Sequence, residues 1–166
     1  MNPMPEPTEE DRRFMRRAIE LGREVAIDQG TAGPFGCVVV KDGEIIAEGA
    51  NRVIVDADPT AHGEMVALRA ACRALGTHLL DGCTVYTSSE PCPMCYAACW
   101  WARVERIWCA SSIDDAQAYG GFDDRAILNA LGLPSTERSL PVDRLCQDEM
   151  RGVWQAFRDR PDRPHY

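Results

Sequence analysis

No stretch of this sequence is apolar for long enough to cross a membrane. The longest apolar runs, residues 37–40 and 96–102, are far shorter than the roughly 20 residues that a membrane-spanning helix needs. The first ten residues hold prolines and acids instead of a basic segment followed by an apolar one, so no secretory signal peptide is expected. These absences predict a cytoplasmic protein with no membrane partner.

Positive charge is also scarce. The 166 residues include 18 Lys and Arg against 26 Asp and Glu, which gives a formal net charge of −8. Proteins that bind polynucleotides normally carry a basic patch, because contacts to phosphates dominate their affinity. The acidic balance therefore argues against a nucleic-acid partner. Lys41 is the only lysine, which we attribute to a coding bias towards arginine.

Cysteine, in contrast, is abundant, with eight in the chain. Without an export signal, and in a chain of this length, these cysteines are expected to stay reduced. Six are interpreted as structural thiols that fill apolar positions, and Cys99 is the least certain of them. Cys92 and Cys95 stand apart because they form a Cys-x-x-Cys pair.

Hydrophobic periodicity and turn signals predict alternating helices and strands. The length and a hydrophobic content of 45% fit a single globular domain over residues 1–166. The Asp42-Gly43 dipeptide is a hairpin signal, and the hairpin makes the sheet of this α/β layered domain mixed. Helices are expected over residues 8–30, 58–75, 93–101, 126–131 and 150–157, and strands over 37–41, 44–51, 83–88, 104–110 and 140–145.

Two segments at predicted helix starts carry residues with metal chemistry. His62 precedes Glu64 by two residues, and Cys92 and Cys95 follow about 30 residues downstream. An imidazole and two thiolates are good zinc ligands, and an i, i+3 spacing places both sulfurs on one helical face. Three protein ligands leave a fourth position for water, as in catalytic zinc sites. The sequence therefore predicts a zinc centre with a carboxylate beside it.

His-x-Glu followed by Pro-Cys-x-x-Cys is the signature of zinc nucleobase deaminases. The chain resembles the cytidine deaminase-like superfamily, and within it is similar to the bacterial guanine deaminases. The resemblance rests on residues 33–36, 58–62, 87–95, 101–103 and 121–124 and on the terminal Tyr166. It implies a three-layer αβα fold with a mixed five-stranded sheet. It also implies a homodimer that exchanges its C-terminal segments, about residues 147–166.

The resemblance also assigns roles to individual residues. His62, Cys92 and Cys95 match the ligands of one catalytic Zn²⁺ per subunit, and Glu64 matches the proton shuttle. Asp124 matches an acid that contacts the substrate and assists proton transfer, with Asp123 as a rival for that position. The matched substrate contacts are Phe35, Asn51, Trp101, Asp124 and Tyr166.

The implied activity is the zinc-dependent hydrolytic deamination of a free nucleobase, guanine, to xanthine and ammonia. Three alternatives stay open from the sequence. The first is a deaminase of guanosine, cytidine or cytosine. The second is a tRNA adenosine deaminase, which the acidic charge disfavours. The third is a zinc module without catalysis, in which Cys99 supplies a fourth ligand.

The sequence departs from the usual family pattern at two positions. Gly63 stands where alanine is usual, and Ser89 stands where guanine deaminases often have cysteine. Glycine in a helix costs about 0.5–1 kcal/mol relative to alanine, so a compensating reason is worth seeking. One hypothesis is that the missing methyl group of Gly63 enlarges the pocket or lets the backbone approach the base.

Overall fold

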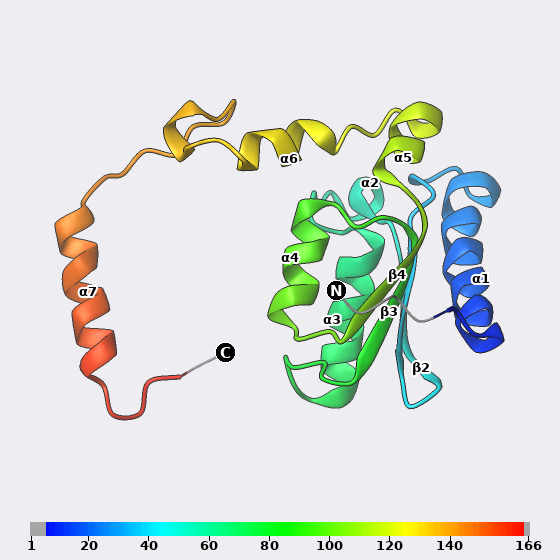
Figure 1. The fold of residues 1–166 in the computed structure, drawn as a ribbon, viewed down its shortest axis with the longest axis horizontal. Coiled ribbons are helices and arrows are strands. Elements are labelled where there is room, and N and C mark those ends of the chain that lie inside the picture. Colours follow the sequence, from blue (N-terminus) through cyan, green and yellow to red (C-terminus); the bar gives the residue numbers. More distant parts are fainter. Residues whose placement is uncertain (1–5, 165–166) are drawn as a thin grey trace. The chain divides into compact units, whose positions relative to one another are not determined.

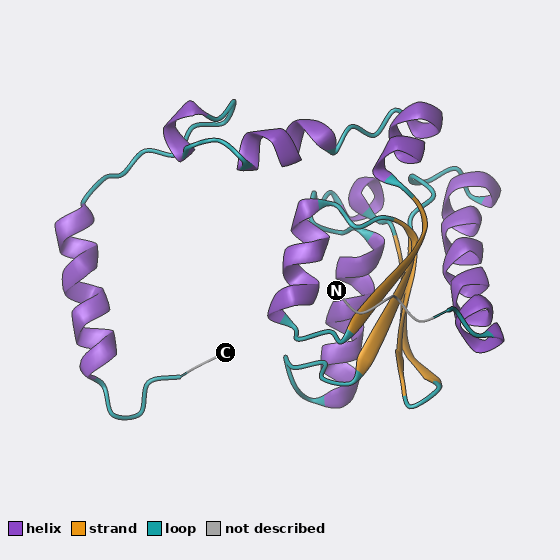
Figure 2. Cartoon of the chain, in the orientation of Figure 1, coloured by secondary structure: helices purple, strands orange, loops and turns teal. Residues whose placement is uncertain are grey.

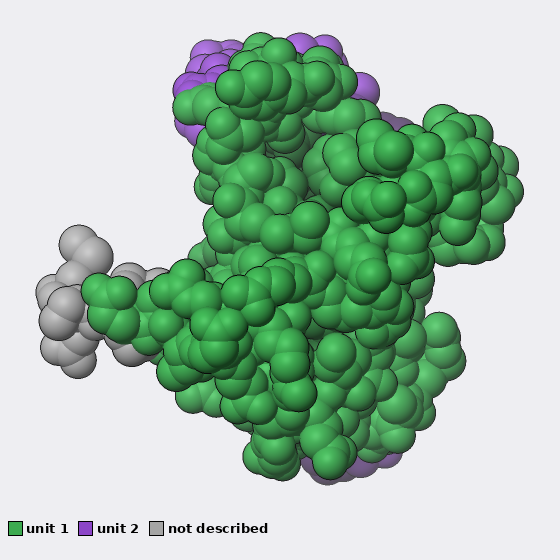
Figure 3. Space-filling view, turned by 90° about the vertical axis from the view of Figure 1, so that its right-hand side faces the viewer, with its two compact units in different colours: residues 1–124 green, residues 125–166 purple. Residues whose placement is uncertain are grey.

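A computed structural model describes residues 6–164 of the chain. The chain divides into two compact units, residues 1–124 and residues 125–166 (Figure 3). Each unit is described by itself below. None of the helices described has the length and apolar character of a membrane span. All eight cysteines are free, as predicted.

A four-stranded mixed sheet forms the centre of the first unit (Figure 2). Its strands are β1 (Gly36–Lys41), β2 (Glu44–Ala50), β3 (Cys83–Ser89) and β4 (Arg106–Ser111). The spatial order is β2-β1-β3-β4, with β1 antiparallel to both of its neighbours and β3 parallel to β4. The predicted α/β class and the mixed sheet are therefore confirmed.

Helices cover both faces of this sheet (Figure 1). Helix α1 (Glu9–Arg23), extended by a π-helical turn (Glu24–Asp28), packs on β1 and β3 on one face. Helices α3 (Gly63–Leu75) and α4 (Pro93–Trp101) lie on the other face. The alternate residues of β1 divide between two cores, with Val38 against α1 and Val39 against α3. The arrangement is the expected αβα sandwich.

Local sequence signals explain where several elements begin and turn. Asp42 and Gly43 both have positive φ angles, 52° and 79°, as a two-residue type I′ hairpin requires. Thr8 and Asp11 form a reciprocal capping box at the start of α1. Pro93 occupies the first turn of α4, where its missing N–H needs no partner.

The predicted fifth strand over residues 140–145 is wrong. This segment has no strand structure, and the described part of the chain contains four strands. Pro141 has no N–H to donate to a neighbouring strand. The N–H of Val142 donates instead to the carbonyl of Ser135, at 2.9 Å. A local turn therefore takes the hydrogen bonds that a strand would need.

Two short helices of the first unit have no counterpart in the sequence prediction. They are α2 (Val53–Asp56) and α5 (Ile113–Gly120). The helix expected from residue 58 begins at Gly63, because the Asp58 side chain accepts hydrogen bonds from the backbone and the hydroxyl of Thr60. Those bonds hold residues 58–60 in a turn.

The second unit consists of helices joined by loops. These are α6 (Arg125–Leu131), a 3₁₀ turn (Ser135–Glu137) and α7 (Gln147–Asp159). Met150, Val153 and Trp154 recur at helical spacing on α7 and are exposed. The single domain predicted over residues 1–166 stays a prediction.

Candidate functional site

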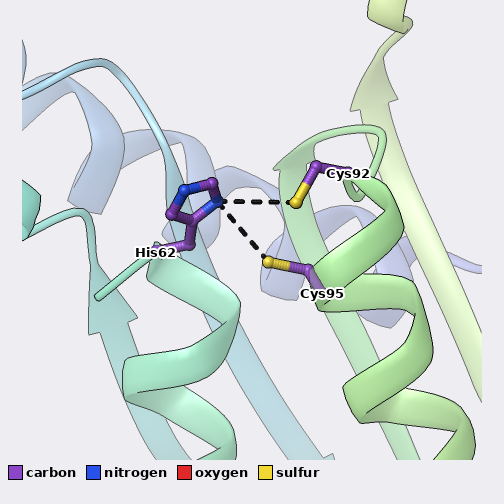
Figure 4. Close-up of side chains that lie close together, drawn as sticks. All are labelled: His62, Cys92 and Cys95. Carbon is purple, nitrogen blue, oxygen red and sulfur yellow. Dashed lines mark hydrogen bonds between the residues drawn. The ribbon is translucent and has the colours of Figure 1, made fainter. Parts of the chain in front are cut away.

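The first residues of α3 and α4 meet at one end of the sheet. His62 is the N-cap of α3 and Cys92 is the N-cap of α4, and both have extended backbone angles. Figure 4 shows the His62 ring directed at the sulfurs of Cys92 and Cys95. A helix N-terminus carries partial positive charge, which favours the thiolate form of cysteine. Two helix starts thus deliver all three predicted metal ligands to one point.

The distances within this cluster fit a tetrahedral zinc ion. Nδ1 of His62 lies 3.6 Å from Sγ of Cys92 and 3.6 Å from Sγ of Cys95. Zinc bonds of about 2.3 Å to sulfur and about 2.0–2.1 Å to nitrogen, at tetrahedral angles, separate N and S by about 3.6 Å. Among residues 6–164, these three side chains form the one group of potential metal ligands. One catalytic zinc ion fits this donor set.

The two sulfurs differ in their proton affinity. The Cys95 thiol donates a hydrogen bond to Cys92, and this bond, together with His62, lowers the pKa of Cys92 to about 4. The shared proton and burial raise the pKa of Cys95 well above its usual range. Cys92 is therefore the more acidic of the two thiols.

Cys99 does not join the cluster. It is buried in the core between the sheet and α3, beside Ala67, Val85 and Ala102. Burial raises the pKa of its thiol to about 12, which keeps it protonated. Cys99 is a core side chain, and the fourth ligand that a closed structural zinc site would need does not come from it.

Glu64 lies in the first turn of α3 and is buried, with 5% of its surface exposed. Its Oε1 accepts a hydrogen bond from the Thr87 hydroxyl of β3, at 3.1 Å. Burial raises the pKa of Glu64 above its ordinary value of 4.5, although the hydrogen bonds from Cys95 and Thr87 oppose this shift. A buried carboxylate with a raised pKa beside a metal site suits proton transfer.

A cavity of about 230 Å³ opens in front of these groups. It brings together the zinc ligands His62 and Cys92, the carboxylate of Glu64 and three of the predicted substrate contacts. Its walls are formed by Gly33, Phe35, Asn51, Val53, Ile54, His62, Glu64, Glu90, Cys92, Phe122 and Asp124. The cavity has a size and a mixed apolar and polar lining that suit a small planar ligand.

Asn51 follows β2, lines the cavity and makes hydrogen bonds that hold the neighbouring backbone. Its side-chain oxygen accepts the N–H of Val53 at 3.1 Å, and its backbone N–H donates to the carbonyl of Phe35 at 2.9 Å. The side-chain oxygen is thus engaged at the start of α2. The amide NH₂ is the group that Asn51 can offer to a ligand.

Asp124, and not Asp123, lines the cavity. Burial raises the pKa of Asp124, and the negative charge of Cys92 raises it further. Of the two neighbouring acids, Asp124 is thus the one that the structure places at the cavity, and its contact with substrate stays a prediction.

Two predicted contacts are not placed at the cavity. Trp101 is the last residue of α4, at the opposite end from Cys92, and is 56% exposed. Nine residues of helix span about 13 Å, so Trp101 does not form a wall of this cavity. Tyr166 lies outside the described residues.

Phe122 and Glu90 are cavity residues that sequence reasoning missed. The Phe122 ring packs edge-on against Phe35, with ring centroids 4.8 Å apart. The Glu90 carboxylate accepts the N–H of Ile113, at the start of α5. Phe122 stands in the segment that carries the family resemblance, so its position in that motif was the available signal.

Replacing Cys92 with alanine is expected to abolish zinc binding, because two donors remain and each zinc–ligand bond contributes to affinity. The matched control is Cys99→Ala, which removes a buried sulfur two turns along the same helix. Zinc content of purified protein, measured by mass spectrometry, should fall to near zero for Cys92→Ala and stay near one per chain for Cys99→Ala. Full zinc occupancy in Cys92→Ala would remove this residue from the ligand set.

Comparisons with known proteins agree with this site. The family model "Cytidine and deoxycytidylate deaminase zinc-binding region" matches residues 8–111. The guanine deaminase of Bacillus subtilis is 44% identical over 92% of this chain and 97% of its own length. The tRNA-specific adenosine deaminase of the same organism is 37% identical over 89% of this chain and 88% of its own length.

The fold agrees as well. The crystal structure of the Bacillus subtilis guanine deaminase superposes with a TM-score of 0.87, covering 93% of this chain and 98% of the other. The match includes the segments that supply the zinc ligands and Glu64, which lie within the family region. The chain therefore belongs to the cytidine and deoxycytidylate deaminase zinc-binding family, in the branch that contains the guanine deaminases.

Proposed function

We propose that this protein hydrolyses guanine to xanthine and ammonia, using Glu64 to move protons and the cavity in front of it to hold the base. The observation that carries the proposal is the meeting, in one cavity, of the zinc ligands with a buried carboxylate that is not itself a ligand. The similarity of nearly the whole chain to a guanine deaminase supports guanine as the substrate.

His62, Cys92 and Cys95 hold the metal. When bound, zinc lowers the pKa of a water molecule from about 15.7 to about 7, which makes hydroxide available at neutral pH. The neighbouring helix starts help the two thiolates to stay ionised. The two cysteines are buried, with 7% and 0% of their surfaces exposed, and the half-buried His62 faces the cavity.

Glu64 accepts the proton of the attacking water and delivers it to a ring nitrogen of the base. The new bond joins the water oxygen to C2 of guanine, and the C2–N bond then breaks as the exocyclic amine leaves. Glu64 carries the second water proton to this amine, so that one water yields xanthine and ammonia. Its raised pKa makes it a better proton donor than an exposed glutamate, and the Thr87 hydroxyl fixes its orientation.

Glu64→Gln should retain zinc and lose turnover by about 10²–10⁴-fold, because glutamine fills the same volume but cannot accept a proton. Ammonia release from guanine measures the rate, and zinc content shows that the metal site is intact. Glu24→Gln, a half-buried position on the π-helical turn that does not line the cavity, is the control. A near-normal rate of ammonia release in Glu64→Gln would show that Glu64 is not the proton carrier.

The lining of the cavity favours a neutral base over a phosphorylated substrate. Glu64, Glu90 and Asp124 contribute carboxylates, and none of the described residues that line the cavity is a lysine or an arginine. Phosphate groups are normally paired with arginine or lysine side chains, and the lining of this cavity offers a nucleotide neither of them. The net charge of −8 acts in the same direction against tRNA.

We assign the base contacts by the chemistry of each side chain. Phe35, with Phe122 packed edge-on against it, presents an aromatic surface for a planar base. Asn51 donates hydrogen bonds through its amide. Asp124 accepts hydrogen bonds from the N–H groups of the guanine edge and assists the proton transfers of Glu64. This edge distinguishes guanine from cytosine and adenine.

Asp124→Asn is expected to reduce kcat/KM for guanine about 10- to 100-fold, because an amide replaces one acceptor with a donor facing the guanine N–H groups. Asp123→Asn is the matched control and should stay within about threefold of wild type, since this residue does not line the cavity. Steady-state kinetics on guanine, guanosine, cytosine, cytidine and tRNA test both the residues and the substrate. Equal losses in the two variants, or a higher kcat/KM on another substrate, would contradict the assignment.

The protein acts as a homodimer that exchanges its C-terminal segments, so that Tyr166 of one chain closes the cavity of the other. The apolar residues on α7 support this proposal, because Met150, Val153 and Trp154 form an exposed stripe that suits a second copy of this chain. The segment begins near residue 147, where α7 starts. The predicted cytoplasmic location stays a prediction.

Mixing two inactive variants tests the exchange. Glu64→Gln and Tyr166→Ala are each expected to be weak alone, whereas co-refolded chains should recover about a quarter of wild-type activity. Half of randomly paired dimers are mixed, and exchange gives each mixed dimer one site with both Glu64 and Tyr166. Without exchange, every site contains either the Glu64→Gln or the Tyr166→Ala substitution, and no activity is recovered. Light scattering establishes the dimer independently.

A further inference from the structure

Gly63 lies between the metal ligand His62 and the carboxylate Glu64, as the first residue of α3, and is buried. A Cβ atom built on it would lie 2.7 Å from the carbonyl oxygen of Phe35 and 3.2 Å from its carbonyl carbon. Real Cβ atoms essentially never come within 3.0 Å of another heavy atom. The missing side chain therefore permits a backbone approach that any other residue would push apart.

The Phe35 peptide on the other side of this contact connects two base contacts. Its carbonyl accepts the backbone N–H of Asn51 at 2.9 Å, and its ring forms the cavity wall with Phe122. A displacement of the Phe35 carbonyl would thus move the ring and disturb Asn51 as well.

Helix α3 has little freedom to retreat from this contact. The carbonyl oxygen of Gly63 faces Gly49 of β2, where an added Cβ would lie only 2.3 Å away. The first turn of α3 is thus in close backbone contact with β2 and with the residue that precedes β1, and it carries His62 and Glu64. A side chain at residue 63 would therefore displace the Phe35 peptide, because the first turn of α3 is already in backbone contact with Gly49 of β2.

We propose that Gly63 is a positioning residue for substrate binding, whose missing side chain sets how close Phe35 and Asn51 lie to Glu64 and the metal ligands. The methyl group of alanine would not enter the cavity, since it would point at the Phe35 backbone. It would move that peptide by at least 0.3 Å, the difference between 2.7 and 3.0 Å. The inference rests on the proposed roles of Phe35 and Asn51 in holding guanine.

Gly63→Ala is expected to raise KM for guanine about fivefold, with kcat within about twofold and zinc content unchanged. The reason is that the ring of Phe35 contacts the base equally in the ground state and the transition state. Gly132→Ala is the matched control, because its Cβ would meet backbone oxygen at an ordinary 3.4 Å. Its KM should equal that of wild type.

A double-variant cycle separates positioning from a purely structural effect. In a Phe35→Ala background, where no ring is left to displace and only the backbone bond to Asn51 transmits the shift, Gly63→Ala should raise KM by less than about threefold. A fivefold rise that persists there would overturn the proposal. An unchanged KM in Gly63→Ala would also overturn it. A fall in kcat or zinc content at constant KM, or a failure of Gly63→Ala to fold, would do the same, since each places the effect on α3 or on the fold.

The same measurements distinguish a failure of the proposed function. If Phe35→Ala alone leaves KM for guanine unchanged, the role of Phe35 as a base contact is wrong, and the inference about Gly63 falls with it. If wild-type protein releases no ammonia from guanine, the proposed activity itself is wrong. If wild-type protein deaminates guanine and Phe35→Ala raises KM, but the effects of Gly63→Ala and Phe35→Ala on KM are simply additive, then only the role proposed for Gly63 is wrong.

Discussion

The site depends on the contact between His62 and the two sulfurs of Cys92 and Cys95, 3.6 Å away in each case. These donors come from two helices whose starts are fixed by the strands that precede or flank them. Extended backbone at each N-cap directs the side chain beyond the end of its helix instead of along its flank. Because the sheet fixes the backbone that carries these donors, the ligands are preorganised and need little rearrangement to bind a metal ion.

The electrostatics of the cavity follow from this placement. A cation held at the helix starts would draw negative charge towards it, and Glu64 lies near enough to benefit while staying outside the ligand set. Burial of Glu64 opposes ionisation, so cation and burial act in opposite directions on one carboxylate. A proton carrier needs such a balance, because it must take up and release a proton in one turnover.

The sequence predicted the parts of the fold and site that local chemistry decides. Asp42-Gly43 located the hairpin and Pro93 the start of α4, since each acts through its own backbone preferences. The zinc ligands could be predicted from the sequence for the same reason, because their spacing follows from the positions at which the two helices begin. The packing of Phe122 against Phe35 could not be predicted in this way, because it joins residues 87 positions apart and exists only after folding. The error over the fifth strand arose likewise, as an apolar segment with a proline looked extended but bonded locally.

The order of strands gives the two sides of the sheet different exposure to other chains. The β2 edge carries exposed Glu44 and Glu48, charges that discourage pairing with a foreign strand. Along β4, the exposed residues Cys109 and Ala110 carry no charge, and β4 pairs with β3 alone among the described strands. An unguarded edge of this kind invites aggregation. The uncharged β4 edge, and not the acidic β2 edge, is therefore the side of the sheet at which a strand of another chain would pair.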